Sequence, residues 1–356
     1  MRHWLGQTRQ ELAEILADNK QPAYRGNQLW DWLHAKRVAD FTAMKNLPPA
    51  LRDALSRLGS LRAFSVRDCR IAADRLTAKW LLAPDSGNDA GEALVECVLI
   101  IERERRRRTV CVSSMAGCPL GCVFCATGGL GFVRNLDAGE IVEQVYRVDD
   151  AARETEEGDG VSHIVFMGMG EPLMNLQPVL SAAALFCDPR GLGLSGRHIT
   201  ISTAGTPEGI MNLAAAGTNY RLAVSLHAPN QKLRERLMPV AKQWKLDALF
   251  RALEKFAATA SRDLTFEYCL IDDVNSSPRE ARELARLVSG LRSKVNLIPL
   301  NPVAGYQGRT PAPDTVRAFR DILETSGVPA TIRVEKGREI GAACGQLKAE
   351  NAIRNS

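Results

Sequence analysis

The chain has 356 residues, of which 45% are hydrophobic and 24% are charged, and its net charge is +5. This length suits one large α/β domain with a small appendage, and no apolar run approaches the ~20 residues of a membrane-spanning helix. The N-terminal stretch MRHWLGQTRQELAEIL lacks the apolar core of a signal peptide, so we expect a cytoplasmic protein without membrane contact. Nine cysteines, an odd number, do not predict a disulfide scaffold in a chain of this size.

Residues 1–60 predict a small helical module. Leu29, Trp32 and Leu33 recur at helical spacing, and Gly59 ends a later helical pattern. Basic residues are spread through this module: Arg25, Lys36, Arg37, Lys45, Arg52 and Arg57. Solvated helix faces explain them most simply, and contact with RNA is the functional alternative.

Residues 61–108 change to the pattern of β-strands. Segments 64–72, 76–83 and 93–104 are rich in β-prone residues, and a turn-rich loop lies at 85–91. We therefore expect a β extension that leads into the next domain. The arginine run at its end, Arg103–Arg108, is interpreted as a solvated turn between strands, although clustered arginines are also typical of nucleic-acid contact.

From Thr109 onward, predicted strands and helices alternate as six βα units. Such repeats imply a parallel sheet with right-handed crossovers. The pattern fits either an incomplete version of the eight-fold barrel or an open doubly wound sheet. The predicted strands lie at 109–115, 163–170, 198–205, 221–228, 264–271 and 295–302.

A glycine-rich loop after the first of these strands carries Cys118, Cys122 and Cys125 at the spacing C-x3-C-x2-C. Thiolates are soft ligands that suit zinc, copper(I) or iron–sulfur centres. Three of them leave one corner of an iron–sulfur cluster open for a small molecule. A zinc site is the main alternative, but no nearby fourth Cys or His completes a tetrahedral set.

This loop resembles that of the radical S-adenosylmethionine (SAM) enzymes. From Tyr24 to the C-terminal region the chain is similar to the RlmN/Cfr family of RNA adenine methyltransferases. The matching motifs occur in the family's order: CVSSMAGCPLGCVFCATG, GFVRNL, FMGMGEPLMN, SLHAPN, LMPV, NLIPLNP and AACGQL.

The resemblance implies how the chain is divided. It implies a partial (βα)6 radical SAM barrel at residues 109–340 and an accessory RNA-binding domain at 1–60. Residues 61–108 would form the β extension, and residues 341–356 a C-terminal segment that carries the catalytic cysteine.

Each predicted strand of the barrel ends in small, polar or glycine-rich residues. At any single strand end, ordinary capping of the next helix explains such residues. When several strand ends around the mouth of one barrel share them, a bound ligand is the better explanation. The resemblance implies that a [4Fe-4S] cluster binds Cys118, Cys122 and Cys125. It also implies the SAM contacts Gly170, Glu171, Ser202, Ser225, Leu226, His227 and Asn301.

The resemblance assigns catalytic roles to three further residues. Cys344 would carry the methyl group, Cys111 would resolve the covalent adduct, and Glu96 would accept a proton. From pattern alone, Cys111 is expected to be a core cysteine. For Glu96 the pattern favours a buried base in an apolar strand and an outward residue of an alternating strand about equally. The family usually has an acidic residue where this chain has Gly341. The remaining cysteines, Cys69, Cys97, Cys187 and Cys269, are interpreted as packing residues.

The implied activity is methylation of adenine C2, at adenine 2503 of 23S rRNA and adenine 37 of tRNA. One SAM would methylate Cys344, and a second, cleaved at the cluster, would activate that methyl group for addition to the base. A Cys111–Cys344 disulfide would then await reduction. We expect a monomer with a flavodoxin-like external electron donor. Two alternatives stay open: methylation at adenine C8, and a non-catalytic RNA-binding protein with a structural metal.

Overall fold

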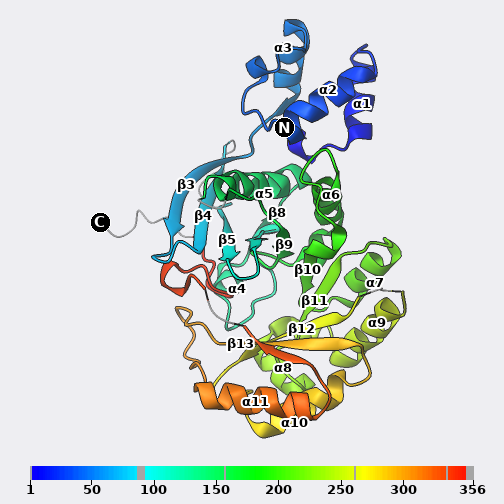
Figure 1. Cartoon of the computed structure of the whole chain (residues 1–356). Coiled ribbons are helices and arrows are strands. Elements are labelled where there is room, and N and C mark those ends of the chain that lie inside the picture. Colours follow the sequence, from blue (N-terminus) through cyan, green and yellow to red (C-terminus); the bar gives the residue numbers. More distant parts are fainter. Residues whose placement is uncertain (1, 86–92, 156–157, 260–261, 334–335, 350–356) are drawn as a thin grey trace.

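A single ten-stranded sheet is the main feature of the computed structural model (Figure 1). The strands lie across it in the order β14-β13-β12-β11-β10-β9-β6-β5-β4-β3. The structure describes residues 2–85, 93–155, 158–259, 262–333 and 336–349. The turn-rich loop expected at 85–91 lies outside these ranges except for Asp85, as do residues 350–356 of the C-terminal segment.

Parallel pairing joins β6 to β9 and continues strand by strand to β14. These strands are β6 (Arg107–Cys111), β9 (His163–Phe166), β10 (Ile199–Thr203), β11 (Arg221–Ser225), β12 (Leu264–Leu270), β13 (Ser293–Pro299) and β14 (Ala330–Ile332). The helices that connect them are α5 (Ala138–Arg153), α6 (Leu176–Cys187), α7 (Pro207–Ala215), α9 (Leu246–Thr259), α10 (Pro278–Val288) and α11 (Pro313–Thr325).

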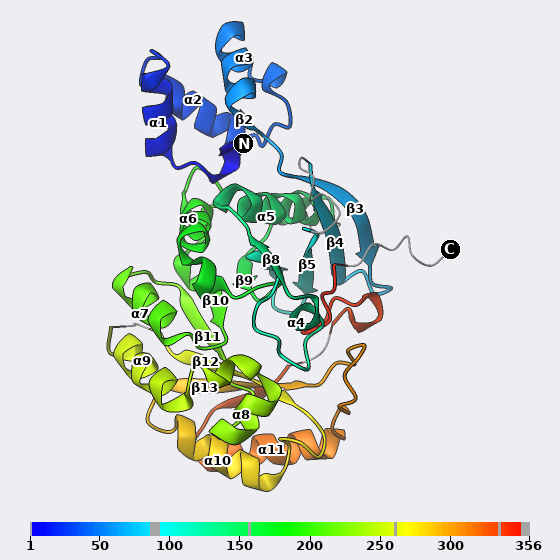
Figure 2. The ribbon, with the colours of Figure 1, turned by 180° about the vertical axis from the view of Figure 1, so that it is seen from behind.

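This arrangement confirms the predicted partial (βα)6 barrel. From β9 to β14 the strand order never reverses, as it would in a doubly wound sheet. Figure 2 shows the connecting helices along the outer side of the curved sheet. The helices pack on the sheet through the apolar faces that the sequence predicts, and α9 buries Leu249, Leu253 and Phe256. The sequence did not predict β14.

The three strands expected before the barrel extend the same sheet in antiparallel fashion. They are β3 (Phe64–Ile71), β4 (Thr77–Pro84) and β5 (Val95–Glu102), and β5 pairs with β6. All residues of β4 are buried, although the strand includes Lys79. The extension is therefore continuous with the barrel wall, and its inner strands bring Lys79 and Glu96 towards the mouth of the barrel.

The N-terminal module packs around two buried tryptophans, Trp4 and Trp30. Its elements are β1 (Arg2–His3), a 3-10 turn at Trp4–Gly6, α1 (Arg9–Asp18), α2 (Tyr24–Trp30), a π turn at Asp31–Ala35, a 3-10 turn at Phe41–Ala43, α3 (Pro49–Leu58) and β2 (Gly59–Ser60). The predicted helix ended by Gly59 corresponds to α3. Among the described residues, no helix of the chain is both long and apolar enough to span a membrane.

Polar contacts hold this module against α5. The ring of His34 stacks on Trp30 at 3.9 Å, and its Nδ1 lies 2.8 Å from the hydroxyl of Tyr146 on α5. The Arg37 guanidinium pairs with Asp149 at 2.7 Å and with Asp150 at 2.6 Å. Arg37, one of the basic residues considered for RNA contact, is therefore engaged in docking the module.

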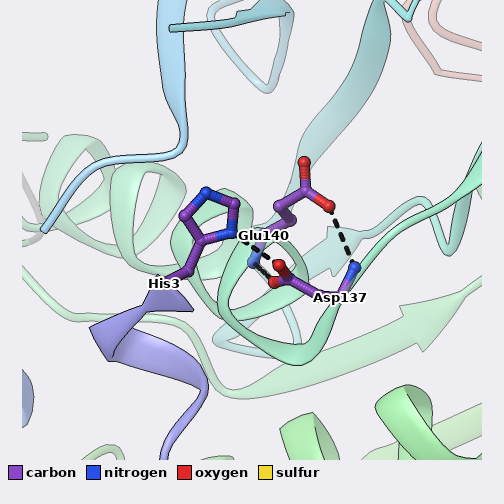
Figure 3. A group of neighbouring side chains, drawn as sticks. All are labelled: His3, Asp137 and Glu140. Carbon is purple, nitrogen blue, oxygen red and sulfur yellow. Dashed lines mark hydrogen bonds and ion pairs between the residues drawn. The ribbon is translucent and has the colours of Figure 1, made fainter. Parts of the chain in front are cut away.

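A second docking contact joins His3 to the start of α5 (Figure 3). Asp137 caps this helix, and it exchanges backbone and side-chain hydrogen bonds with Glu140. His3 Nδ1 lies 2.6 Å from Asp137 Oδ2. Burial lowers the pKa of His3, but its hydrogen bond to Asp137 and the negative charges of nearby carboxylates together outweigh this and leave the pKa raised. Because Arg134 also pairs with Glu140 at 2.6 Å, we interpret the three side chains as a helix cap and not as a metal site.

We expect His34→Gln to reduce the acid sensitivity of the module. Burial lowers the pKa of His34 to about 3, whereas an unfolded histidine titrates near ~6.5. The unfolded state therefore takes up a proton that the folded state refuses, and stability is lost as pH falls below about 6.5. Between about pH 7.5 and about pH 5.5, the linkage contributes about 1 kcal/mol.

Urea unfolding at the two pH values, followed by tryptophan fluorescence, measures this difference. In the variant, the pH dependence of the unfolding free energy should shrink by that amount. An unchanged pH dependence would contradict a neutral, buried His34.

Candidate functional site

The loop that carries Cys118, Cys122 and Cys125, here named the cluster loop, folds back tightly on the end of β6. After Cys111 the chain crosses to β7 (Met115–Gly117), which pairs with β8 (Phe132–Asn135) around the short helix α4 (Ala126–Leu130). Gly117 has φ +71, and a Cβ there would lie 2.0 Å from the carbonyl oxygen of Gly131. Only glycine fits this position, so the close β7–β8 turn depends on it.

The three cysteines of the loop form a donor set that a metal cluster would stabilise. Cys118 is buried, and Cys122 and Cys125 are half-buried. Burial raises the pKa of Cys118 to about 12. Burial also raises the pKa of Cys122, and the charges of Cys125 and Cys118 raise it further. Three such thiolates repel one another in a poorly hydrated loop, and a bound cationic centre offsets that repulsion.

Gly170 and Glu171 follow β9 and lie against the cluster loop. Gly170 has φ +102, and a Cβ there would lie 2.6 Å from Met115 Cβ. The Glu171 carboxylate accepts the backbone N–H groups of Ala204 at 2.7 Å and Leu173 at 3.2 Å. Burial raises the pKa of Glu171 to about 7 in spite of these hydrogen bonds. Glu171 thus ties the ends of β9 and β10 together behind the loop.

We expect Gly170→Ala to weaken both SAM binding and stability. The new methyl group clashes with Met115 in a backbone conformation that favours glycine, a cost of about 2 kcal/mol. Thermal unfolding and equilibrium dialysis with SAM measure the two effects. Gly290→Ala is the matched control, since a Cβ at Gly290 meets nothing within 4 Å. Normal SAM binding by the Gly170 variant would remove this residue from the cofactor site.

The next strand ends place Ser202, Ser225 and His227 along the same edge of the sheet. Ser202 is on β10 and Ser225 ends β11. His227 has φ +57, and its Nδ1 accepts the N–H of Cys269 at 2.9 Å. Burial lowers its pKa to about 3, so the ring is neutral, and it packs edge-on against Phe124 of the cluster loop. His227 therefore packs against the cluster loop and supports it.

Leu226 differs from its neighbours because its side chain is fully buried in the core. Its N–H donates to the carbonyl of Glu267 at 3.0 Å, and its carbonyl accepts from Arg234 at 3.3 Å. A ligand could meet Leu226 only at its backbone. Arg234, on α8 (Gln231–Leu237), also donates to the carbonyl groups of Ala204 and Ser225. The sequence did not predict α8 or this buried arginine.

Asn301 links the end of β13 to the segment that carries Cys344. Its Nδ2 donates to the carbonyl of Cys344 at 3.1 Å, and its Oδ1 is buried with no hydrogen-bond partner among the described residues. The N–H of Ala126 donates to the carbonyl of Gly345 at 2.7 Å, and the hydroxyl of Thr127 donates to Leu347 at 2.7 Å. The structure thus places Cys344 between α4 and Asn301.

Cys111 and Cys344 are far apart in the sequence, but the charge of Cys344 acts on Cys111. Burial raises the pKa of Cys111 to about 12, and the charge of Cys344 contributes to the rise. Arg333, at the end of β14, feels both sulfurs, and the charge of Cys344 is the main cause of its raised pKa. All nine cysteines are free, so the structure does not contain the Cys111–Cys344 disulfide that the resemblance implies.

The four cysteines interpreted as packing residues differ in exposure. Cys97 and Cys269 are buried, and Cys187 is half-buried. Cys69 is exposed on β3, so the packing interpretation is wrong for it, because β3 is an edge strand and its last three residues are all exposed.

Glu96 is buried at the inner side of β5, not turned outward. Its Oε1 lies 2.7 Å from Lys79 Nζ, and its Oε2 accepts the N–H groups of Lys348 at 2.7 Å and Ala349 at 3.1 Å. The structure therefore places Glu96 beside the Cys344 segment, in contact with its backbone.

Comparison with known proteins decides the family. The model described as "Ribosomal RNA large subunit methyltransferase N-terminal domain" matches residues 3–60, and the radical SAM superfamily model matches residues 112–285. "Probable dual-specificity RNA methyltransferase RlmN" of Moorella thermoacetica is 44% identical over 340 residues, which cover 95% of each chain. The chain belongs to the RlmN family.

Two further relatives agree in sequence and in structure. "Dual-specificity RNA methyltransferase RlmN" of Solidesulfovibrio magneticus is 42% identical over 96% of this chain and 94% of its own. The crystal structure of a radical SAM methyltransferase from Sphaerobacter thermophilus superposes with a TM-score of 0.92 at 39% identity. It covers 98% of this chain and 100% of that chain.

The radical SAM superfamily implies a [4Fe-4S] cluster and SAM, and the residues present fit both groups. The donor set is three thiols in one loop. Two buried polar atoms next to the loop, Asn301 Oδ1 and Ser114 Oγ, have no hydrogen-bond partner among the described residues. Ser114 Oγ lies 2.9 Å from the Cβ position of Gly170. Sequence reasoning missed Ser114, although it stands in the quoted motif CVSSMAGC.

The arginine run lies away from this site. It forms the turn between β5 and β6 and includes the first two residues of β6, so it is at the N-terminal edge of the parallel strands. Cys111 and Gly170 are at or beyond the opposite edge. Arg108 is buried and pairs with Asp159 at 3.1 Å. Contact of the run with RNA phosphates stays a prediction, and it would require an RNA that extends well past the site.

Proposed function

We propose that this chain methylates carbon 2 of adenine in 23S rRNA and in tRNA, with Cys344 as the methyl carrier. The supporting observation is the position of Cys344, which is held by α4 and Asn301 within electrostatic reach of Cys111. The relatives from Moorella and Solidesulfovibrio are both described as RNA methyltransferases. A structural metal site alone would have no use for this pair of cysteines.

When bound, the cluster and SAM supply a radical that activates an otherwise unreactive C–H bond. In this proposal Cys118, Cys122 and Cys125 hold the cluster. The SAM contacts are Gly170, Glu171, Ser202, Ser225, the backbone of Leu226, His227 and Asn301. Cleavage of SAM consumes an electron, so the proposal includes an external, flavodoxin-like electron donor. We also propose that the protein is a monomer in the cytoplasm.

The catalytic residues divide the remaining work. The Cys344 sulfur receives the methyl group and becomes the atom through which the protein joins the base. Glu96, buried beside this segment, accepts the proton that leaves the adenine carbon. Cys111 then loses its proton and its sulfur attacks the Cys344 sulfur. The S–S bond forms as the bond from Cys344 sulfur to the base-linked carbon breaks, and that carbon takes up a proton, which releases the methylated RNA. The resulting disulfide is returned to two thiols by external reductant.

Exposed apolar side chains on the cluster loop support an RNA substrate. Phe132 is 50% exposed, Leu130 42%, and Val123 and Val133 each 39%. Unstacked bases pack on such surfaces, and an adenine must leave its stack to reach Cys344. The loop therefore offers the flipped base and its neighbours an apolar support beside the site.

Incubation of the reconstituted protein with rRNA and tRNA fragments and methyl-labelled SAM tests this function. Nucleoside mass spectrometry should find the label at adenine C2 in both RNAs. Label at adenine C8 would show that the chain methylates C8 and not C2. A protein that binds RNA but transfers no label would support the non-catalytic alternative.

A further inference from the structure

A buried ion pair connects the β extension to the segment that carries Cys344. Lys79 on β4 and Glu96 on β5 are only 7% and 3% exposed, and Lys79 Nζ lies 2.7 Å from Glu96 Oε1. Figure 1 shows the C-terminal segment, in red, returning to the ends of these two strands. A buried pair of this kind contributes little net stability compared with apolar packing, so its placement needs another explanation.

Each partner of the pair also binds the backbone of the segment. Lys79 Nζ donates to the carbonyl of Gly341 at 3.1 Å, ahead of Cys344. Glu96 Oε2 accepts the N–H groups of Lys348 and Ala349, beyond Cys344. The ion pair therefore links the two ends of the Cys344 segment, because Lys79 holds one end and Glu96 holds the other. Both residues lie on neighbouring strands of the same sheet.

Gly341 makes the contact with Lys79 a backbone contact. The residue has φ 66 and ψ 33, and a Cβ there would lie 3.4 Å from Lys79 Nζ. An acidic side chain at this position would compete with Glu96 for the same ammonium group. With glycine, Lys79 binds the carbonyl of residue 341 and the Glu96 carboxylate together.

We propose that Lys79 is a positioning residue that, with Glu96, clamps residues 341–349 and so fixes the Cys344 sulfur between the cluster loop and Cys111. The clamp rests on the proposed function only in that Cys344 is the methyl carrier. Lys79 itself touches neither substrate nor cofactor. Its role precedes any reaction on RNA, and this separates it from the proton-accepting role of Glu96.

The test compares the accessibility of Cys344 in variants of the reconstituted holoenzyme. Trypsin, cutting after Arg338 and Lys348, releases a peptide, residues 339–348, in which Cys344 is the one cysteine. Its mass reports both alkylation by iodoacetamide without SAM and methylation after incubation with SAM. Lys79→Met should raise the alkylation rate of Cys344 at least about tenfold, because charged hydrogen bonds of this kind oppose loop opening. The methylated fraction should fall, while iron content stays normal.

Two further variants make the result specific. Lys79→Met/Glu96→Gln leaves no unpaired buried charge and should still alkylate faster, so it serves if the single variant fails to fold. Lys336→Met is the matched control, because Lys336 donates to the carbonyl of Ile101 at 2.8 Å and ties the chain to β5 ahead of the clamp. Its alkylation rate should equal that of the unaltered chain.

Unaltered alkylation in both Lys79 variants, or an equal increase in Lys336→Met, would overturn the clamp. Failure of the proposed function looks different. In that case the unaltered chain would never show a methylated 339–348 peptide, while the comparison of alkylation rates would still decide whether the clamp exists.

Discussion

Replacement of any one of Cys118, Cys122 and Cys125 by alanine is expected to abolish iron loading and SAM cleavage. The three sulfurs come from one short loop whose shape is fixed by β7, β8 and Gly117. No rotation of the loop can bring another cysteine into the missing place, because Cys111 and Cys344 are fixed on β6 and on the Asn301-bound segment. Two thiolates do not satisfy a cluster that normally takes four ligands.

Iron analysis and visible absorption after anaerobic reconstitution measure this loss. Cys69→Ala is the matched control, since Cys69 is exposed on β3 and should leave the iron content unchanged. Full iron content in a triple alanine variant would show that the metal binds elsewhere. A colourless, zinc-loaded unaltered protein would instead favour the structural-metal alternative.

Much of the fold follows from local pattern. The alternation of strands and helices predicts the six βα units because each helix buries one apolar face and each parallel strand is apolar on both faces. The short strand Ala330–Ile332 and the helix Gln231–Leu237 escape this reasoning. Neither is long enough to show a period, and each depends on its neighbours: β14 on pairing with β13, and α8 on Arg234 binding several strand ends.

The candidate site also has one part that the sequence predicts and another that only the fold reveals. The cysteine triplet is local in sequence, so its spacing alone indicates a metal centre. The surroundings of Cys344 are not local: 262 residues separate Lys79 from Gly341 and 252 separate Glu96 from Lys348. Nothing in the strand pattern of β4 marks Lys79, because a lysine in a strand is ordinarily solvated. Only the fold reveals that its ammonium group is buried against the segment that carries Cys344.

Cys111→Ala and Cys344→Ala are expected to fail at opposite ends of the reaction. In the proposed mechanism Cys344 carries the methyl group first, so Cys344→Ala should give no methylated 339–348 peptide and no methylated RNA, although iron loading stays normal. In the same mechanism, Cys111 acts only after the carbon–carbon bond exists. Cys111→Ala should therefore methylate Cys344, attack RNA and stall as protein joined covalently to RNA.

The stalled complex is visible on a denaturing gel and is sensitive to ribonuclease. Burial raises the pKa of Cys111, so in the resting site its sulfur is a neutral thiol and a poor nucleophile. Proton removal from Cys111 therefore has to accompany its attack on the adduct, and the alanine variant removes that step entirely. Cys187→Ala, at a half-buried cysteine on α6, is the control that should turn over freely. Free turnover by Cys111→Ala, or methylation of RNA by Cys344→Ala, would rule out the two-cysteine mechanism for this chain.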